Sequence, residues 1–294
     1  MTSLNLTFLG TGSSIPTLKR NHPTVHLHYQ GRDKHSILFD CGEGTQLQLT
    51  KAKINFMHIN YIFITHWHLD HFIGIFALLS SMGMEGRERE INIIGPGIDK
   101  INKSLFKFFN FRFKINFIDS VREGIVFENE EFLVKSMKVR HTIETVAYKF
   151  VEKPRIKLDK EKIKKLKLTW EECKRIKEKQ KIKKDGKAIK LKDISFETQA
   201  RKLVYSGDTI YLKKMEKFCK GADILVHDCN YFSREDLEKK MHSCLEDVLK
   251  FRKLVKKLYL FHIGRKYQSQ SELGKKVKKY KNVFVSKDFE KVKI

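Results

Sequence analysis

The sequence is short of acidic residues, of cysteine and of long apolar runs. It has 35 Asp and Glu residues against 60 Lys and Arg residues, which leaves a formal net charge of +25. The longest apolar run, residues 72–79, is interrupted by Gly74 and falls far short of the roughly 20 residues that span a bilayer. The first residues carry no basic segment ahead of an apolar stretch, so we expect neither membrane attachment nor a cleaved signal peptide.

The cysteine content excludes a disulfide framework and a zinc knuckle. The cysteines are odd in number, widely spaced and free of any CxxC pair. Such usage is typical of reduced thiols, and it predicts a cytoplasmic location. The five residues are Cys41, Cys173, Cys219, Cys229 and Cys244.

The length and composition predict a folded chain with an anionic partner. With 294 residues, 41% of them hydrophobic, the chain can bury a sizeable core, and intrinsic disorder is excluded. A charge of +25 favours a polyanion, either nucleic acid or an anionic membrane surface. The alternative is a general lysine bias that serves no particular partner.

Short apolar runs alternate with helical patterns along the chain, which predicts a mixed α/β fold. Helices are expected at residues 72–81 and 237–255, where apolar residues recur at helical spacing. Buried strands are expected at residues 4–9, 37–39, 61–64, 91–94, 203–205, 224–226 and 258–261.

One segment differs from the rest in its charge. Residues 152–192 contain 18 Lys or Arg and seven Asp or Glu, so this stretch carries +11 of the total. Apolar residues thread through it at spacings that fit short helices with one apolar side. We therefore expect a small ordered projection with a basic face. The alternative is a solvated helical hairpin that contacts nothing.

A cluster of metal-binding residue types follows the predicted strand at residues 61–64. On an extended chain alternate side chains point the same way, so His66 and His68 can converge on one ion. Asp70 and His71 diverge from that face toward a second ion. A helix would not place residues two apart on one side. Four strong ligand types within six residues predict a metal site.

Further candidates share one position in the sequence pattern, because each directly follows an apolar run. Strand ends that meet at one rim of a sheet commonly form a binding site. A single His or Asp at a strand end is more often structural, and the evidence lies in the set of five. These residues are Asp40, His141, Asp208, His227 and His262.

The order of these residues resembles the metallo-β-lactamase superfamily. Surrounding segments narrow the resemblance to the ribonuclease Z family, the tRNA 3'-processing endonucleases, and the likeness spans nearly the whole chain. The basic insertion and the segment around Pro16 add to it. The segments are FLGTG at 8–12, FDCGEGTQ at 39–46, YSGDT at 205–209 and HIGRKY at 262–267.

The resemblance implies an α/β fold of the metallo-β-lactamase type, an αβ/βα four-layer sandwich with a protruding basic arm. Residues 1–294 would form a single catalytic domain, with residues 152–198 inserted as a Lys-rich tRNA-binding arm. Two Zn2+ ions per subunit are implied, and Mn2+ or another divalent metal is an alternative. One ion would bind His66, His68 and His141, the other Asp70, His71 and His262, and Asp208 would bridge the two.

The implied activity is removal of the 3' trailer from precursor tRNA. A metal-activated water would cut 3' of the discriminator base and leave a 3'-hydroxyl on the tRNA. Asp70 would accept a proton from that water, and His242, steered by Asp228, would protonate the leaving oxygen. The alternative for His242 is a polar helix cap.

The remaining assignments come from the same resemblance. Asp40 and His227 would lie behind the ligands and orient them. RNA contacts are expected from Lys19, Arg20, Arg265 and Lys266, with a solvated loop as the alternative for the first two. The family also implies a homodimer.

The chain departs from the family at three points. The carboxylate after His227 is Asp228, one methylene shorter than the family's glutamate. The usual Arg-Tyr after the last metal histidine is Lys266-Tyr267, with Arg265 displaced by one, and the arm lacks the usual Gly-Pro-rich turn. Two other functions stay open at this stage. One is a phosphodiesterase of the same fold that acts on small molecules or other RNA, and the other is a catalytically inactive RNA-binding subunit.

Overall fold

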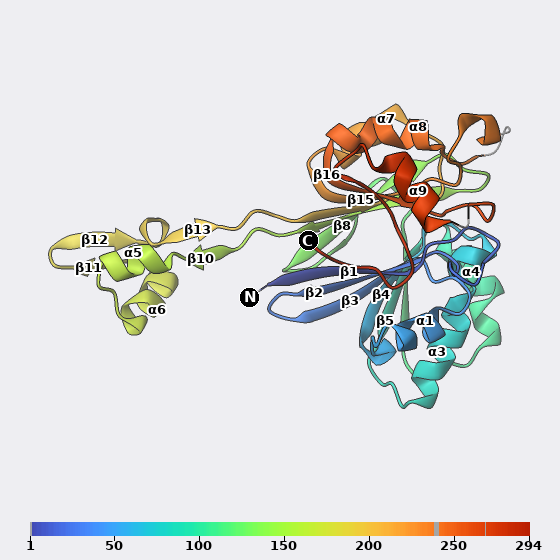
Figure 1. Ribbon diagram of the computed structural model, residues 1–294. Helices are drawn as coiled ribbons and strands as arrows, with labels where there is room; N and C mark the ends of the chain where they lie inside the picture. Colours follow the sequence, from blue (N-terminus) through green and yellow to red (C-terminus); the bar gives the residue numbers. More distant parts are fainter. Residues whose placement is uncertain (1, 238–240, 268) are drawn as a thin grey trace. The chain divides into compact units, whose positions relative to one another are not determined.

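The structure, a computed structural model, describes residues 2–237, 241–267 and 269–294. The chain divides into two compact units, one formed by Met1–Val151 with Arg201–Ile294 and the other by Glu152–Ala200. Figure 1 shows both units. None of the helices in the described ranges is long and apolar enough to cross a membrane.

The larger unit contains two seven-stranded sheets. The first sheet has the strand order β18-β1-β2-β3-β4-β5-β6. Strands β1, β2, β3 and β18 pair antiparallel, and β3 to β6 pair parallel. Its strands are β1 (Ser3–Gly10), β2 (Thr24–Gln30), β3 (Lys34–Phe39), β4 (Ile59–Phe63), β5 (Ile91–Gly95), β6 (Ile115–Asp119) and β18 (Lys291–Lys293).

The second sheet has the order β17-β16-β15-β14-β9-β8-β7. Strands β14 to β17 pair parallel, whereas β9 and β14 run antiparallel. Its strands are β7 (Gly124–Glu128), β8 (Phe132–Val139), β9 (Thr145–Glu152), β14 (Lys202–Tyr205), β15 (Ala222–Asp228), β16 (Val255–Phe261) and β17 (Val283–Val285).

The two sheets bury an apolar core between them, and helices cover their outer faces (Figure 1). Because side chains alternate along a strand, Leu27 enters the core between the sheets while His26 faces the other way. The first sheet is covered by α1 (Thr45–Lys51), α2 (Leu69–Phe72), α3 (Gly74–Met84) and α4 (Ile98–Ser104). The second is covered by α7 (Lys213–Cys219), α8 (Leu245–Val248) and α9 (Gln270–Val277). The layers are thus helix, sheet, sheet and helix, as predicted.

The seven predicted strands and the helix at residues 72–81 are confirmed. The single helix predicted at residues 237–255 is wrong. In the described part of that stretch, α8 and a 3-10 turn at Leu249–Lys253 are short, and β16 already begins at Val255. Cys244 is extended, with φ −102° and ψ 167°, and it forms a backbone bridge with Tyr231. Tertiary hydrogen bonds therefore prevent a continuous helix here, although apolar residues recur at helical spacing. They keep the segment around residue 242 out of a helix.

The smaller unit, Glu152–Ala200, has its own core. Ile176, Ile189 and Ile194 are buried together. Thr169 caps the second helix by accepting a hydrogen bond from the Glu172 N–H, while the Glu172 carboxylate accepts one from the Thr169 N–H. The elements are β10 (Ile156–Leu158), α5 (Lys160–Lys165), α6 (Trp170–Lys179), β11 (Lys181–Lys184), β12 (Lys187–Lys190) and β13 (Ser195–Glu197). We call this unit the arm.

Candidate metal centre and active site

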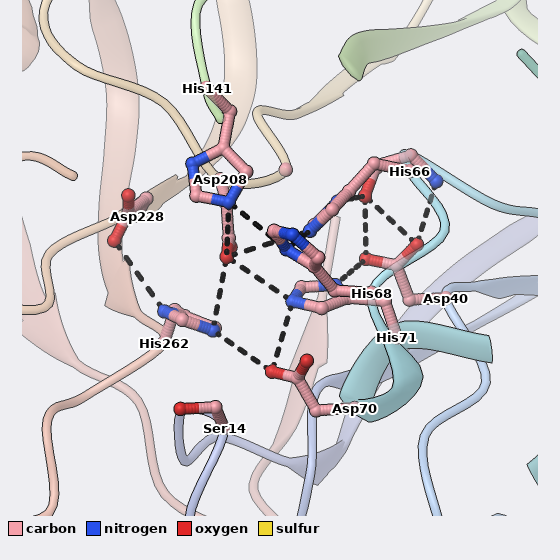
Figure 2. A network of polar contacts seen from close by, with 12 residues as sticks. Ser14, Asp40, His66, His68, Asp70, His71, His141, Asp208, Asp228 and His262 are labelled. Carbon is pink, nitrogen blue, oxygen red and sulfur yellow. Dashed lines mark hydrogen bonds and ion pairs between the residues drawn. The ribbon is translucent and has the colours of Figure 1, made fainter. Parts of the chain in front are cut away.

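The candidate ligands follow strand ends of both sheets. Strands β3 and β4 are parallel neighbours, so Asp40 and the segment that begins at Thr65 emerge at the same edge. In the second sheet β14, β15 and β16 are parallel, and they bring Asp208, Asp228 and His262 to one edge. Short loops after these strands carry the side chains into one cluster (Figure 2).

Three histidines form the first group of the cluster. His68 Nδ1 lies 3.0 Å from His66 Nε2 and 3.1 Å from His141 Nε2. Figure 2 shows these rings converging, although His141 is distant in sequence from His66 and His68. Three imidazole nitrogens at such distances can bind one cation together.

Asp208 joins this group to a second one. Its Oδ2 lies 3.3 Å from His71 Nε2 and from His262 Nε2, and 3.8 Å from His66 Nε2 and His141 Nε2. Asp70 Oδ2 lies 3.4 Å from His71 Nε2 and 3.6 Å from His262 Nε2. One carboxylate oxygen therefore stands between two ligand groups, which is the arrangement that a bridging ligand needs.

Two of these nitrogens are buried without a hydrogen bond. Within the described residues, His71 Nε2 and His262 Nε2 have no hydrogen-bond partner. A buried polar atom without a partner costs roughly 1 to 3 kcal/mol. A cation between Asp70, Asp208 and the two rings would remove that cost. The residues present therefore fit a divalent metal, and imidazole with carboxylate is a donor set suited to zinc.

Asp40 lies behind the ligands and contacts one of them, His71, directly. Its carboxylate accepts hydrogen bonds from the Thr65 N–H at 2.8 Å and from the Tyr205 hydroxyl at 2.8 Å. His71 Nδ1 lies 2.8 Å from Asp40 Oδ2, which leaves Nε2 of His71 directed at Asp70 and Asp208. Asp40 also adopts a φ of 56°, a conformation that residues other than glycine rarely hold.

Electrostatics keep the carboxylates of the cluster charged. Burial opposes ionisation of Asp70, but the nearby rings of His262 and His71 hold its pKa below the ordinary value. Burial likewise opposes ionisation of Asp208, and the charges of His262 and His71 lower its pKa. Burial lowers the pKa of His66, so this ring is neutral and able to bind a metal.

His242 and Asp228 form a pair beside the cluster. His242 Nδ1 lies 2.9 Å from Asp228 Oδ2, so the shorter carboxylate still reaches the ring. The same oxygen accepts a hydrogen bond from the Thr209 N–H at 3.1 Å, which fixes its position. Burial disfavours the protonated ring, but the charge and hydrogen bond of Asp228 raise the pKa of His242 to about 9.

The cluster opens into a cleft of about 910 Å³. Of the predicted RNA-binding residues, Arg265 and Lys266 line this cleft, and Lys266 forms an ion pair with Asp236. Lys19 is exposed but is not among the lining residues.

The structure corrects the role predicted for Arg20. This side chain is buried, with 6% of its surface exposed. Its guanidinium donates hydrogen bonds to Thr11 Oγ1 at 2.6 Å, to the Ser286 carbonyl at 2.7 Å and to Gln270 Oε1. With its donors engaged in tying loops together, Arg20 is not available to an RNA.

The position of His227 also differs from the prediction. Strand alternation turns its neighbour Val226 into the core between the sheets and His227 toward the outer helices, where its ring stacks on Phe251 with centroids 4.9 Å apart. Its Nδ1 lies 2.8 Å from the Asp228 carbonyl oxygen. His227 therefore supports the backbone around Asp228 and does not orient a ligand directly.

Sequence reasoning missed several residues that hold the ligands. Thr65 Oγ1 lies 2.9 Å from His66 Nδ1, and the Met241 carbonyl lies 2.9 Å from His141 Nδ1. Asn230 Nδ2 lies 3.2 Å from His262 Nδ1. The position of Thr65 directly before the His motif is a usable signal. A backbone carbonyl such as that of Met241 leaves no signal in the sequence.

Comparisons with known proteins agree with this fold. A family model described as "Anti-Pycsar protein Apyc1" matches residues 4–148. The ribonuclease Z of Thermococcus sibiricus is 36% identical over 305 residues, which cover 99% of this chain and 96% of the relative. The structure of human tRNase Z, short form, aligns with a TM-score of 0.69 and 25% identity and covers 98% of both chains. The metallo-β-lactamase fold protein YhfI from Bacillus subtilis aligns with a TM-score of 0.70 and 17% identity, covering 99% of this chain and all of its own. The fold is therefore the predicted metallo-β-lactamase fold, and the chain belongs to the ribonuclease Z family.

Proposed function

We propose that this chain is a metal-dependent endoribonuclease that removes the 3' trailer from precursor tRNA, leaving a 3'-hydroxyl on the tRNA. The observation that carries the proposal is the convergence of the seven predicted ligands, Asp208 among them, into one cluster in a chain 36% identical to a ribonuclease Z. Phosphodiester cleavage needs charge stabilisation on both the attacking and the leaving oxygen, and a pair of ligand groups about one carboxylate suits that need.

We assign two metal ions, zinc in the first instance, to the two ligand groups. His66, His68 and His141 would hold one, Asp70, His71 and His262 would hold the other, and Asp208 would be shared. When bound, such a pair supplies Lewis acidity and a more acidic water. Support for zinc comes from the donor set, which consists of imidazoles and carboxylates. The five cysteines are not part of it, because they are buried elsewhere as free thiols.

His242 is proposed to donate a proton to the leaving oxygen. Asp228 engages Nδ1 of His242, which leaves Nε2 as the atom that can donate into the cleft that His242 lines. Asp70 is proposed to accept a proton from the attacking water, because its carboxylate is held ionised at the cleft. Asp228 acts on the ring that it orients and does not touch substrate.

The arm is proposed to bind the tRNA through its phosphates. Residues 152–192 carry a net +11, and Trp170 at the start of α6 is 78% exposed. Cationic side chains bind phosphate, and an exposed indole can stack on a base. Binding through phosphates and stacking tolerates variation in the RNA sequence. This suits tRNAs, which share a shape.

Two further proposals follow from the family. We propose a homodimer in which the arm of one subunit presents tRNA to the metal site of the other. Light scattering should then give a mass near twice the 34.7 kDa of one chain, and a mass of one chain would contradict it. A cytoplasmic location is supported by the five free, buried cysteines.

The decisive experiment is a cleavage assay with mapped ends. The metal-loaded protein is incubated with a tRNA that carries a 3' extension, in zinc and in manganese buffers. We expect one cut after the discriminator base and a 3'-hydroxyl product. The absence of any metal-dependent cut near that base would overturn the proposal.

A variant without the arm separates this function from hydrolysis of small phosphodiesters. Val151 of β9 lies opposite Lys202 of β14, so residues 153–200 can be replaced by an Asn-Gly turn that closes a two-residue hairpin. The variant should lose cleavage of tRNA and keep hydrolysis of a small chromogenic phosphodiester. Undiminished tRNA cleavage would favour a small-molecule enzyme with an incidental basic surface.

A further inference from the structure

The first sheet carries a second cavity whose lining shares no residue with the cleft over the metal ligands. Its volume is about 650 Å³, within the range of roughly 300 to 1,000 Å³ that is usual for small-molecule sites. The floor is the outward face of β1, β2 and β3, and the wall is the segment that follows α1, including Lys53 and the 3-10 turn Phe56–His58.

The floor consists of polar side chains in cross-strand rows. Asn5 lies opposite His28, and His28 lies opposite Ser36. A second row runs from Lys291 through Thr7 to His26. Directly paired residues point to the same face, so both rows project into the cavity. The other face of the same strands contributes apolar side chains such as Leu6, Leu27 and Ile37 to the core.

The charge of the cavity has a single sign. Lys34, Lys53, Arg89 and Lys291 line it, together with three histidines, and among the described residues no carboxylate lines it. Within the described ranges, none of these three lysines forms an ion pair. The nearby Glu90 instead pairs with Lys114 at 3.3 Å. Like charges without counterions repel one another, so this arrangement favours an anionic occupant.

A buried imidazole in the floor has an unused hydrogen-bonding atom. His26 is 4% exposed, and its Nε2 lies 2.8 Å from Ser36 Oγ. Its Nδ1 is buried and has no hydrogen-bond partner among the described residues. Leaving such an atom unpaired costs roughly 1 to 3 kcal/mol, which a ligand or an ordered water would remove. The cavity thus combines fixed cations with an unsatisfied polar group.

We propose that this cavity binds a small phosphorylated compound of about mononucleotide size. Lysine and arginine would hold the phosphate, since both bind phosphate oxygens through charge-assisted hydrogen bonds. The imidazole and amide groups of the floor, such as those of His28 and Asn5, would hydrogen-bond the rest of the ligand. A cationic or a purely apolar ligand does not fit this lining.

The test is isothermal titration calorimetry of the metal-loaded full chain with inorganic phosphate, with AMP and with a short single-stranded RNA. We expect AMP to bind, and the double variant Lys34→Gln/Lys291→Gln to bind it at least tenfold more weakly. Both lysines are exposed, so the variant should fold, which circular dichroism checks. The matched control is Lys213→Gln, an exposed lysine in α7 that is not among the lining residues.

The metal cluster could itself attract a phosphate, so a second control is needed. Lys266→Gln changes the cleft over the cluster and should leave the AMP affinity of this cavity unchanged. Loss of AMP binding in Lys266→Gln but not in the Lys34→Gln/Lys291→Gln variant would overturn the proposal. So would binding of the RNA alone, with neither phosphate nor AMP bound.

Discussion

At the scale of single residues, a substitution in the pair of His242 and Asp228 tests proton transfer separately from metal binding. We predict that His242→Asn keeps its metal and loses about 10²- to 10⁴-fold in kcat on tRNA, because a general acid contributes about that factor. Metal analysis and cleavage rates check this. His262→Ala is the control, since it should lose metal as well as activity.

The nature of the leaving group sharpens the same prediction. A phosphodiester with an acidic phenol as leaving group needs little protonation, so His242→Asn should cleave it far better, relative to the parent, than it cleaves tRNA. An equal loss on both substrates would mean that His242 serves the metal site or the fold, and it would contradict the role as proton donor.

His26 should make stability depend on pH. Burial, with a smaller effect from His28, lowers the pKa of His26 to about 3 in the folded chain, against an ordinary value of 6.5. The unfolded chain therefore binds a proton near pH 5 that the folded chain does not. The contribution of His26 to the free energy of unfolding is fully present above pH 6.5. It declines as pH falls, by about 2 kcal/mol at pH 5.

The variant His26→Gln isolates this effect. Denaturant unfolding in phosphate-free buffer at pH 7 and pH 5 measures the free energy of unfolding of both proteins. The decrease in this free energy from pH 7 to pH 5 should be about 2 kcal/mol smaller in His26→Gln than in the parent. Comparing the two pH values within each protein cancels the packing change of the substitution. Equal pH dependence in parent and variant would contradict the neutral buried state of His26.

At the scale of elements, the arm should make tRNA binding depend steeply on salt. Each phosphate neutralised contributes roughly 0.7 to 0.9 to the slope of log affinity against log salt. The Asn-Gly replacement of residues 153–200 should reduce this slope by several units, whereas Trp170→Ala should weaken binding with little change in slope. Filter binding at several salt concentrations measures both. A shallow slope in the intact chain would contradict electrostatic binding by the arm.

At the scale of the whole molecule, the metal should contribute to stability as well as to catalysis. The ligands come from both sheets, so an ion held by His68 and His141, or by Asp70 and His262, ties the two halves together. At a metal concentration 100-fold above Kd, binding to the folded chain alone adds about 2.7 kcal/mol. A chelator should lower the unfolding temperature, and zinc should restore it. The His262→Ala variant should respond less to both.

Much of the fold and of the candidate site could be predicted from the sequence, because both follow from local patterns of apolar and polar residues. Apolar runs that end in His or Asp mark buried strands whose ends meet at one edge, which led to Asp40, Asp208 and His262. Features set by tertiary contacts could not be predicted. The buried hydrogen bonds of Arg20 and the outward turn of His227 depend on which chain segments pack nearby.

The two ends of the arm enter and leave through neighbouring strands of one sheet, with Val151 opposite Lys202. The ladder between β9 and β14 already holds these ends together, so the fold of the catalytic unit does not depend on the length of the inserted segment. The arm can therefore be exchanged for another segment. Arms from relatives could be spliced at this point to redirect one unchanged metal site to RNAs of other shapes, and substrate choice could diverge without altering the chemistry.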